Sequence, residues 1–268
     1  MNDLFGQPAT AKKPWYSPSR LKLFLECARR YKFQYVDKLP TKPSPHLDLG
    51  SNVHSALRDW LRLKPKERNH DNLIEFYRSA WRANMPAFAT KTRDELKEWG
   101  ERGKAMLLRY ADALDPALEP IMTERNVHAD YGDVVVGGRI DRVDALEDGS
   151  LIVVDYKTGK FPGRPQRAKD EDLAAPVYAR ATSLAFAGAP VTQVQLHYLE
   201  SGQQLVFEVD EIWQMHKDLA VIEAANAARA AETANEFPAR PSVLCGWCDF
   251  KGRCPEGKAF LDASPDQH

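Results

Sequence analysis

Gly138-Arg-Ile-Asp141 and Leu151-Ile-Val-Val-Asp155-Tyr-Lys157 are the two stretches that decide the fold and its chemistry. Each reads as a β-strand, and the turn between them contains Glu147-Asp148-Gly149. Because side chains alternate along a strand, Asp155 and Lys157 are expected on the same face. Two carboxylates and an ammonium that converge on one spot are costly unless they neutralise each other or hold a cation. Both a strand-end ion pair and a metal-dependent catalytic site fit this pattern.

The rest of the chain predicts an α/β protein, because helical periodicity precedes and follows a block of alternating strands. The first helix is expected from Ser17, as N-cap, to about Val36. Further helices are expected at about 50–63, 70–85, 94–112, 171–186 and 210–231, and strands at 121–129, 133–146, 151–156, 193–200 and 204–209. One domain is predicted over 17–262, comprising a helical lobe (about 50–115), a sheet region (about 117–210) and a Cys-rich segment (238–262). A flexible N-terminus (1–16) and a tail (263–268) complete the predicted organisation.

Composition is that of a globular protein with a substantial core: 268 residues, 43% hydrophobic and 28% charged. No window approaches the apolar length of a membrane span, and the start, Met-Asn-Asp-Leu-Phe-Gly, lacks the features of a signal peptide. A cytoplasmic location without membrane partners is therefore expected. The net charge of −1 conceals basic segments, since residues 12–42 carry nine Lys/Arg against two acids and 158–169 carry four with no acid. Such local patches suit phosphate backbones, although scattered solvated lysines explain them too.

The four cysteines form a second pattern: Cys27 near the start, and Cys245-Gly-Trp-Cys248 with Cys254 near the end. In a reducing compartment this spacing indicates metal ligation rather than disulfides. Three clustered thiolates need a fourth ligand, and Cys27 is the remaining cysteine. Four thiolates fit either zinc or an iron–sulfur cluster, and they would clamp the two ends of the domain together.

The strand motif, together with the upstream Gly50-Ser-Asn-Val-His54, resembles the RecB-type branch of the PD-(D/E)XK nuclease superfamily. The resemblance implies a restriction-endonuclease-like fold, with a mixed central sheet flanked by helices, and a site for Mg²⁺ or Mn²⁺. By this resemblance, Asp141, Asp155 and Lys157 are catalytic, and the metal ligands are His54, Asp141, Asp155 and the backbone carbonyl of Tyr156. Glu124, on the preceding strand, is a further candidate carboxylate, although an exposed strand residue is an equally good interpretation.

RecB-type nucleases also carry a Gln-x-x-x-Tyr element that contacts DNA near the cleavage point. The corresponding segment here keeps the tyrosine, Tyr178, but has Ala174 at the position of the glutamine. The missing amide bears on substrate positioning rather than on metal binding. Tyr178, Arg29, Arg30 and Lys160 are the expected DNA-contacting residues.

The cysteine segments extend the resemblance. Ser17 to Phe33 is similar to the first-cysteine helix of AddB-like and CRISPR-associated iron–sulfur nucleases, and Cys245 to Pro255 is similar to their terminal three-cysteine segment. This implies a structural [4Fe-4S] cluster held by Cys27, Cys245, Cys248 and Cys254, with zinc as the alternative occupant.

Taken together, these motifs predict a metal-dependent deoxyribonuclease of DNA repair, expected to act as an exonuclease on single strands or ends. DNA is its expected partner, with repair or CRISPR-adaptation proteins as further candidates. The alternative is a non-catalytic, nuclease-fold DNA-binding or adaptor subunit, and Ala174 is the residue that supports it.

Overall fold

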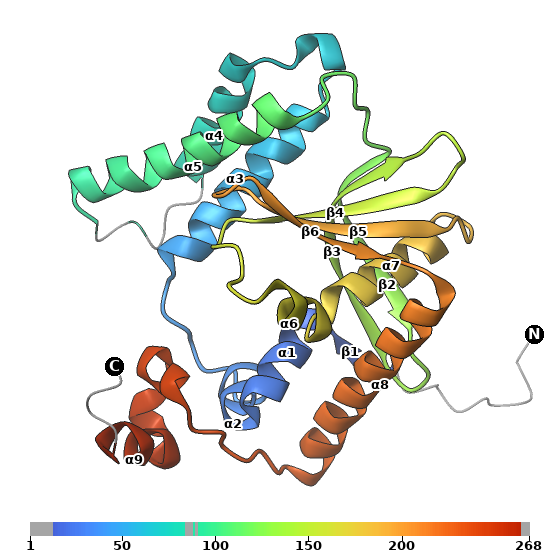
Figure 1. Cartoon of the computed structure of the whole chain (residues 1–268). Helices are drawn as coiled ribbons and strands as arrows, with labels where there is room; N and C mark the ends of the chain where they lie inside the picture. The colour runs from blue at the N-terminus through green and yellow to red at the C-terminus, as the bar shows by residue number, and fades with distance from the viewer. Residues whose placement is uncertain (1–12, 84–87, 89–90, 264–268) are drawn as a thin grey trace, which may run out of the picture.

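A mixed β-sheet forms the centre of the molecule in the computed structural model, which describes residues 13–83, 88 and 91–263 (Figure 1). Its strands are β1 (Trp15–Tyr16), β2 (Met122–Asp130), β3 (Val135–Ala145), β4 (Leu151–Lys157), β5 (Val191–Tyr198) and β6 (Gln203–Glu208). β3 runs antiparallel to β2 and β4 and parallel to β1, while β5 is parallel to β4 and antiparallel to β6. The mixed sheet that was predicted from the sequence is confirmed.

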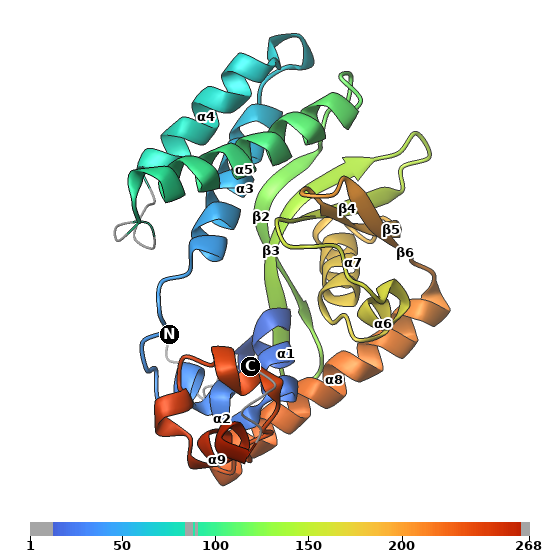
Figure 2. The same ribbon diagram turned by 60° about the vertical axis from the view of Figure 1, so that its left-hand side comes forward.

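Helices cover both faces of this sheet (Figures 1 and 2). The helical lobe on one face comprises α3 (Pro45–Leu61), α4 (His70–Ala83) and α5 (Arg93–Ala113), and its core includes Leu57, Met106 and the β4 residues Val154 and Tyr156. The other face packs against α1 (Pro18–Glu26), α7 (Ala174–Ala185) and α8 (Glu211–Ala234). β4 is therefore buried between two cores, with Leu151 and Val153 facing the second one.

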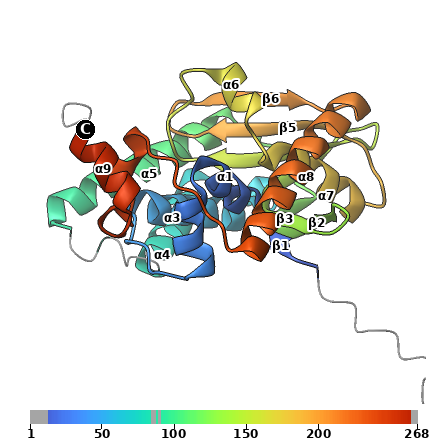
Figure 3. The ribbon, with the colours of Figure 1, turned by 90° about the horizontal axis from the view of Figure 1, so that it is seen from below.

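The two ends of the domain lie together, because α8 runs alongside α7 and α1 (Figure 3). Arg20 on α1 forms an ion pair of 2.7 Å with Glu232 on α8, and the Tyr16 hydroxyl donates to the same carboxylate at 2.9 Å. The chain then continues past 3-10 turns at Val243–Trp247 and Lys251–Arg253 into α9 (Pro255–Ala263), beside α2 (Ala28–Tyr31) (Figure 2). The remaining helical pieces are a π-helical turn (Lys32–Val36), a 3-10 turn (Pro65–Glu67) and α6 (Pro165–Asp170).

The structure refines several of the predicted elements. The expected first helix is interrupted at Cys27, whose backbone is extended (φ −162°, ψ 105°), although Ser17 does cap its start by accepting from the Arg20 N–H. Trp15 and Tyr16, assigned to the lead-in, pair with β3 instead. The predicted end of the third helix at Met85, the lead-in at 1–12 and the tail at 264–268 lie outside the described residues. Within the part of the chain that is described, no helix is long and apolar enough to cross a bilayer.

Candidate metal centre and cysteine cluster

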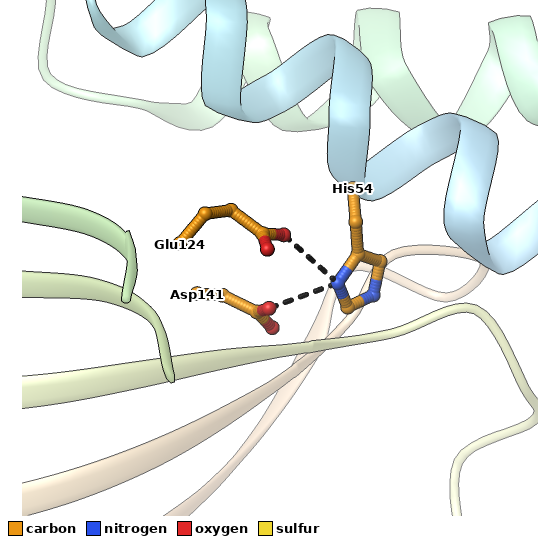
Figure 4. A group of neighbouring side chains, drawn as sticks. All are labelled: His54, Glu124 and Asp141. Carbon is orange, nitrogen blue, oxygen red and sulfur yellow. Dashed lines mark hydrogen bonds and ion pairs between the residues drawn. The ribbon is translucent and has the colours of Figure 1, made fainter. Parts of the chain in front are cut away.

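Glu124 on β2 and Asp141 on β3 stand opposite each other at an irregularity in the sheet. The flanking pairs Thr123–Arg142 and Arg125–Ile140 keep the register, but Glu124 has a left-handed backbone with φ of 48°. The left-handed region is unfavourable for a residue with a β-carbon, so the surrounding structure must impose it. The register of the flanking pairs places the two carboxylates at the same level of the β2–β3 hairpin, where α3 crosses above them (Figure 4).

His54, on α3, completes a compact group with these two acids (Figure 4). Its Nδ1 lies 2.9 Å from Asp141 Oδ1 and 3.7 Å from Glu124 Oε1. Among the described residues, this is the one set of three His, Cys, Asp or Glu side chains whose ligand atoms all lie within 4.8 Å of one another. The structure therefore unites the predicted ligands His54 and Asp141 and adds Glu124, which sequence reasoning had left undecided.

The electrostatics of this group favour a positive charge at its centre. Burial by itself lowers the pKa of His54, but the adjacent Asp141 carboxylate, followed by Glu124 and Asp155, raises it to about 10. Burial raises the pKa of Asp141, and the neighbouring His54 opposes that shift. Glu124 also forms an ion pair with Arg139, in which Glu124 Oε2 lies 2.7 Å from Arg139 Nε. One imidazole nitrogen and two carboxylates are a donor set that binds divalent cations such as Mn²⁺.

Asp155 and Lys157 lie on the α7 side of β4, as strand alternation predicted. Lys157 Nζ is 2.5 Å from Asp155 Oδ2, and the lysine side chain remains 37% exposed whereas that of Asp155 is 8% exposed. Asp155 lies outside the compact group of three but is close enough for its charge to act on His54. The intervening Tyr156 donates its backbone N–H to Asp141 Oδ2 at 2.7 Å. This bond connects the predicted catalytic elements on β3 and β4.

The first turn of α7 borders the same region. Tyr178 lies against β3, where a β-carbon on Gly138 would be only 3.1 Å from its ring, so the glycine of Gly-Arg-Ile-Asp makes room for the tyrosine. Asp172 caps this helix by accepting from the N–H groups of Ala174 and Ala175 at 2.8 and 2.7 Å. Tyr178 is therefore placed beside the carboxylates, as the predicted DNA contact requires. Its role in binding DNA stays a prediction.

The four cysteines line one hollow between α2 and the C-terminal turns, together with Arg29, Arg30, Arg240 and Lys251. Backbone N–H groups of Ser242 and Gly257 donate to the sulfurs of Cys245 and Cys254 at 3.5 and 3.4 Å. A β-carbon on Gly257 would lie 3.4 to 3.5 Å from those two sulfurs, so this glycine leaves space for them. The structure thus gathers Cys27 with the terminal trio, as predicted, although no disulfide joins any of them.

Two predicted DNA contacts belong to this hollow rather than to the hairpin. Arg29 donates to the Phe237 carbonyl at 2.9 Å and pairs with Glu256 at 3.3 Å, so it ties α2 to the C-terminal segment. Arg30 lines the same hollow. Lys160 is exposed in the loop after β4. The roles of Arg29, Arg30 and Lys160 in DNA binding stay predictions.

Comparison with known proteins places these features in context. Residues 16–255 match the sequence model of the PD-(D/E)XK nuclease superfamily. A segment of the chain is 30% identical over 152 residues to a subunit of the ATP-dependent helicase/deoxyribonuclease of Streptococcus pyogenes serotype M6, and 29% identical to its counterpart in serotype M12. These matches cover 53% of this chain and 14% of the relatives, so the chain spans only a small part of their length. A candidate exonuclease from Eubacterium rectale has the same fold, with a TM-score of 0.57 and 14% identity over 99% of this chain and 100% of that one.

Proposed function

The chain belongs to the PD-(D/E)XK nuclease superfamily, and on that basis we propose that it is a divalent-metal-dependent deoxyribonuclease acting on single strands or ends. One observation carries the proposal: the compact group of His54, Glu124 and Asp141 lies next to the Asp155–Lys157 pair. Two carboxylates and one imidazole nitrogen form a donor set that suits a hard or borderline cation, and Asp155 is close enough for its charge to act on the same imidazole.

The residues that would hold Mg²⁺ or Mn²⁺ are His54, Asp141 and Asp155, with Glu124 as a further carboxylate and the Tyr156 carbonyl as a backbone ligand. When bound, the cation supplies charge neutralisation at the phosphate and an activated water. The Tyr156 N–H holds one oxygen of Asp141 and leaves the other directed at His54, so the carboxylate is oriented from the side of β4.

Lys157 is the group that acts on the scissile phosphate. Its ammonium is anchored by Asp155 yet remains accessible, so it can donate a hydrogen bond to a phosphate oxygen as negative charge develops there. Tyr178 borders the same site from α7 and would contact the nucleotide next to the cleaved bond. Lys160, in the exposed loop that follows, would neutralise backbone phosphates without taking part in the reaction.

Digestion of DNA by the purified protein tests this function. End-labelled linear single- and double-stranded DNA and covalently closed circles are incubated with Mn²⁺, with Mg²⁺ or with a chelator. We expect metal-dependent release of short products from the linear substrates and intact circles. Cleaved circles would show endonucleolytic action. If neither metal supports cleavage but fluorescence anisotropy shows that the protein binds DNA, the protein is a non-catalytic DNA-binding or adaptor subunit, the alternative that Ala174 favours.

We also propose a second, structural metal centre: a [4Fe-4S] cluster held by Cys27, Cys245, Cys248 and Cys254. Four thiolates fit either a tetrahedral zinc ion or an iron–sulfur cluster, and the similarity of the two cysteine segments to those of iron–sulfur nucleases favours the cluster. Arginines and a lysine line the hollow, which suits the net negative charge of a thiolate-bound cluster.

Metal analysis of anaerobically purified protein distinguishes the two occupants. An iron–sulfur protein is expected to be brown and to contain about four iron and four sulfide per chain. Gly257→Val should lower the iron content, because the added side chain would enter the space beside Cys245 and Cys254. Gly163→Val is the matched control, since a β-carbon there meets nothing within 4 Å. Colourless protein with one zinc per chain would rule out the iron–sulfur cluster.

The proposed partners are DNA-repair proteins, because the Streptococcus relatives belong to a helicase/deoxyribonuclease of more than one chain. We propose that this chain likewise acts together with such proteins, and co-purification of the full chain with a repair partner would test that association.

A further inference from the structure

A buried polar network lies on the lobe side of β4, away from the Asp155–Lys157 pair. Arg142 donates to the Tyr110 hydroxyl, which in turn donates to the Tyr156 hydroxyl at 3.1 Å. Arg142 is also paired with Asp144 at 2.9 Å. Each of the four residues is at most 8% exposed. Replacing such a buried ion pair with apolar residues is often neutral or stabilising, so fold stability alone gives little reason for this network.

The network is joined to the metal centre through two residues. Arg142 directly follows Asp141 on β3, and Tyr156 stands between Asp155 and Lys157 on β4. The backbone pairing of β3 with β4 ends at Arg142–Val154. Beyond that pair, the Tyr156 N–H is bonded to the Asp141 carboxylate instead of to a strand carbonyl. The position of Tyr156 therefore decides where the Asp141 carboxylate is held.

Tyr156 also supports the third member of the centre. Its ring packs edge-on against His54, with centroids 5.8 Å apart, and against Tyr110, with centroids 5.1 Å apart. Tyr110 lies on α5, whereas His54 lies on α3. A displacement of the Tyr156 ring would thus shift both the imidazole and the carboxylate.

We propose that Tyr110 and Arg142 are positioning residues for the metal centre. They act through Tyr156: the charged Arg142 polarises the Tyr110 hydroxyl, Tyr110 fixes the Tyr156 phenol, and the Tyr156 backbone fixes Asp141. This inference rests on the proposed function, because it assumes that Asp141 and His54 bind a divalent cation. It adds to that function two residues that touch neither metal nor DNA.

The test is Mn²⁺ affinity, measured by isothermal titration calorimetry on the DNA-free protein. Tyr110→Phe removes one hydroxyl and keeps the ring. Tyr77→Phe is the matched control, because Tyr77 is buried in the same lobe and its hydroxyl has no hydrogen-bond partner among the described residues. We expect Tyr110→Phe to weaken Mn²⁺ binding about tenfold, the lower end for residues that orient metal ligands, and Tyr77→Phe to leave it unchanged.

Three further variants separate positioning from a loss of stability. Tyr156→Phe should weaken Mn²⁺ binding as much as Tyr110→Phe, and the double variant should be no weaker than either single one, since all three break the same contact. Arg142→Lys keeps the charge beside Asp144 but loses the guanidinium fork, and it should lie between wild type and Tyr110→Phe.

The outcomes distinguish this inference from the proposed function. Wild-type Mn²⁺ affinity in Tyr110→Phe, or an equal loss in Tyr77→Phe, would overturn the positioning role and leave the proposed nuclease intact. A wild-type protein that binds no Mn²⁺ would overturn the proposed function itself.

Discussion

Two histidines pack against the ring of Tyr156, and their environments are opposite. The centroid of His54 lies 5.8 Å from that ring and the centroid of His197 lies 6.4 Å from it. Burial lowers the pKa of both rings. The carboxylates around His54 reverse this shift and raise the pKa of His54 to about 10. The positive charge of Arg142 instead reinforces the shift at His197, whose pKa is lowered to about 3.

This comparison shows that two different electrostatic environments meet at one tyrosine ring. On the His54 side, two carboxylates lie beside the imidazole and the lysine of the neighbouring Asp155–Lys157 pair remains accessible, so the region offers ligands for a cation. On the His197 side, Arg142 and Asp144 pair with each other and are closed off from solvent. The first region is suited to reaction and the second to support.

The largest expected effect is on the reactive side. Lys157→Ala removes the donor to the phosphate and should lower kcat for DNA cleavage about 1,000-fold, the scale of losing one donor that stabilises transition-state charge. Mn²⁺ affinity should be retained, because Lys157 is not a ligand. Lys160→Ala is the control and should raise KM with little change in kcat. Equal single-turnover rate constants for cleavage by Lys157→Ala and by wild type would exclude Lys157 from the reaction.

The region around His197 should make the folding stability of the protein depend on pH. The pKa of His197 is lowered in the folded protein. Below about pH 6.5 the unfolded chain therefore binds a proton at this residue that the folded chain does not bind, and the free energy of unfolding falls as the pH drops towards 3. At pH 5 this single group should cost about 2 kcal/mol relative to pH 7.5.

The measurement is urea unfolding at those two pH values. His197→Gln keeps a donor for Gln195, whose side-chain oxygen lies 2.8 Å from the His197 ring, but cannot titrate. It should therefore lose about 2 kcal/mol less stability than wild type on going to pH 5. An identical loss in both proteins would show that His197 is not held neutral.

A smaller effect concerns the residue that joins the metal centre from β2. Glu124→Gln should weaken Mn²⁺ binding about tenfold, because it removes one carboxylate but keeps the shape of the side chain. Glu147→Gln, on the exposed turn between β3 and β4, is the matched control. Unchanged affinity in Glu124→Gln would leave Glu124 as a partner of Arg139 alone.

The sequence predicted those parts of the site that depend on local periodicity. Asp155 and Lys157 could be placed on one side of a strand because strand alternation is regular, and the mixed sheet was expected from the resemblance. The place of Glu124 could not be predicted, because it depends on a left-handed backbone and on its register opposite Asp141. The Tyr110–Tyr156 contact joins residues 46 positions apart from a helix and a strand, which no local pattern encodes.

The cysteine region shows the same limit. Cys27 was grouped with the distant terminal trio because it is the one remaining cysteine and because its segment resembles that of iron–sulfur nucleases, and the structure brings all four to one hollow. The break of the first helix at Cys27 was missed, because the periodicity of apolar residues continues across it. Arg29 was expected to contact DNA from its charge, yet it contacts the C-terminal segment, since charge alone does not reveal which partner is nearest.

The most direct test of the central claim is Mn²⁺-dependent cleavage of end-labelled DNA by Asp141→Asn. The asparagine oxygen can still accept the Tyr156 N–H, so the fold should be preserved while the charge that attracts the cation is lost. We predict that this variant melts at the wild-type temperature, binds Mn²⁺ about 100-fold more weakly and releases no labelled product. Wild-type cleavage by Asp141→Asn at the same Mn²⁺ concentration would contradict a metal-dependent nuclease site on this hairpin.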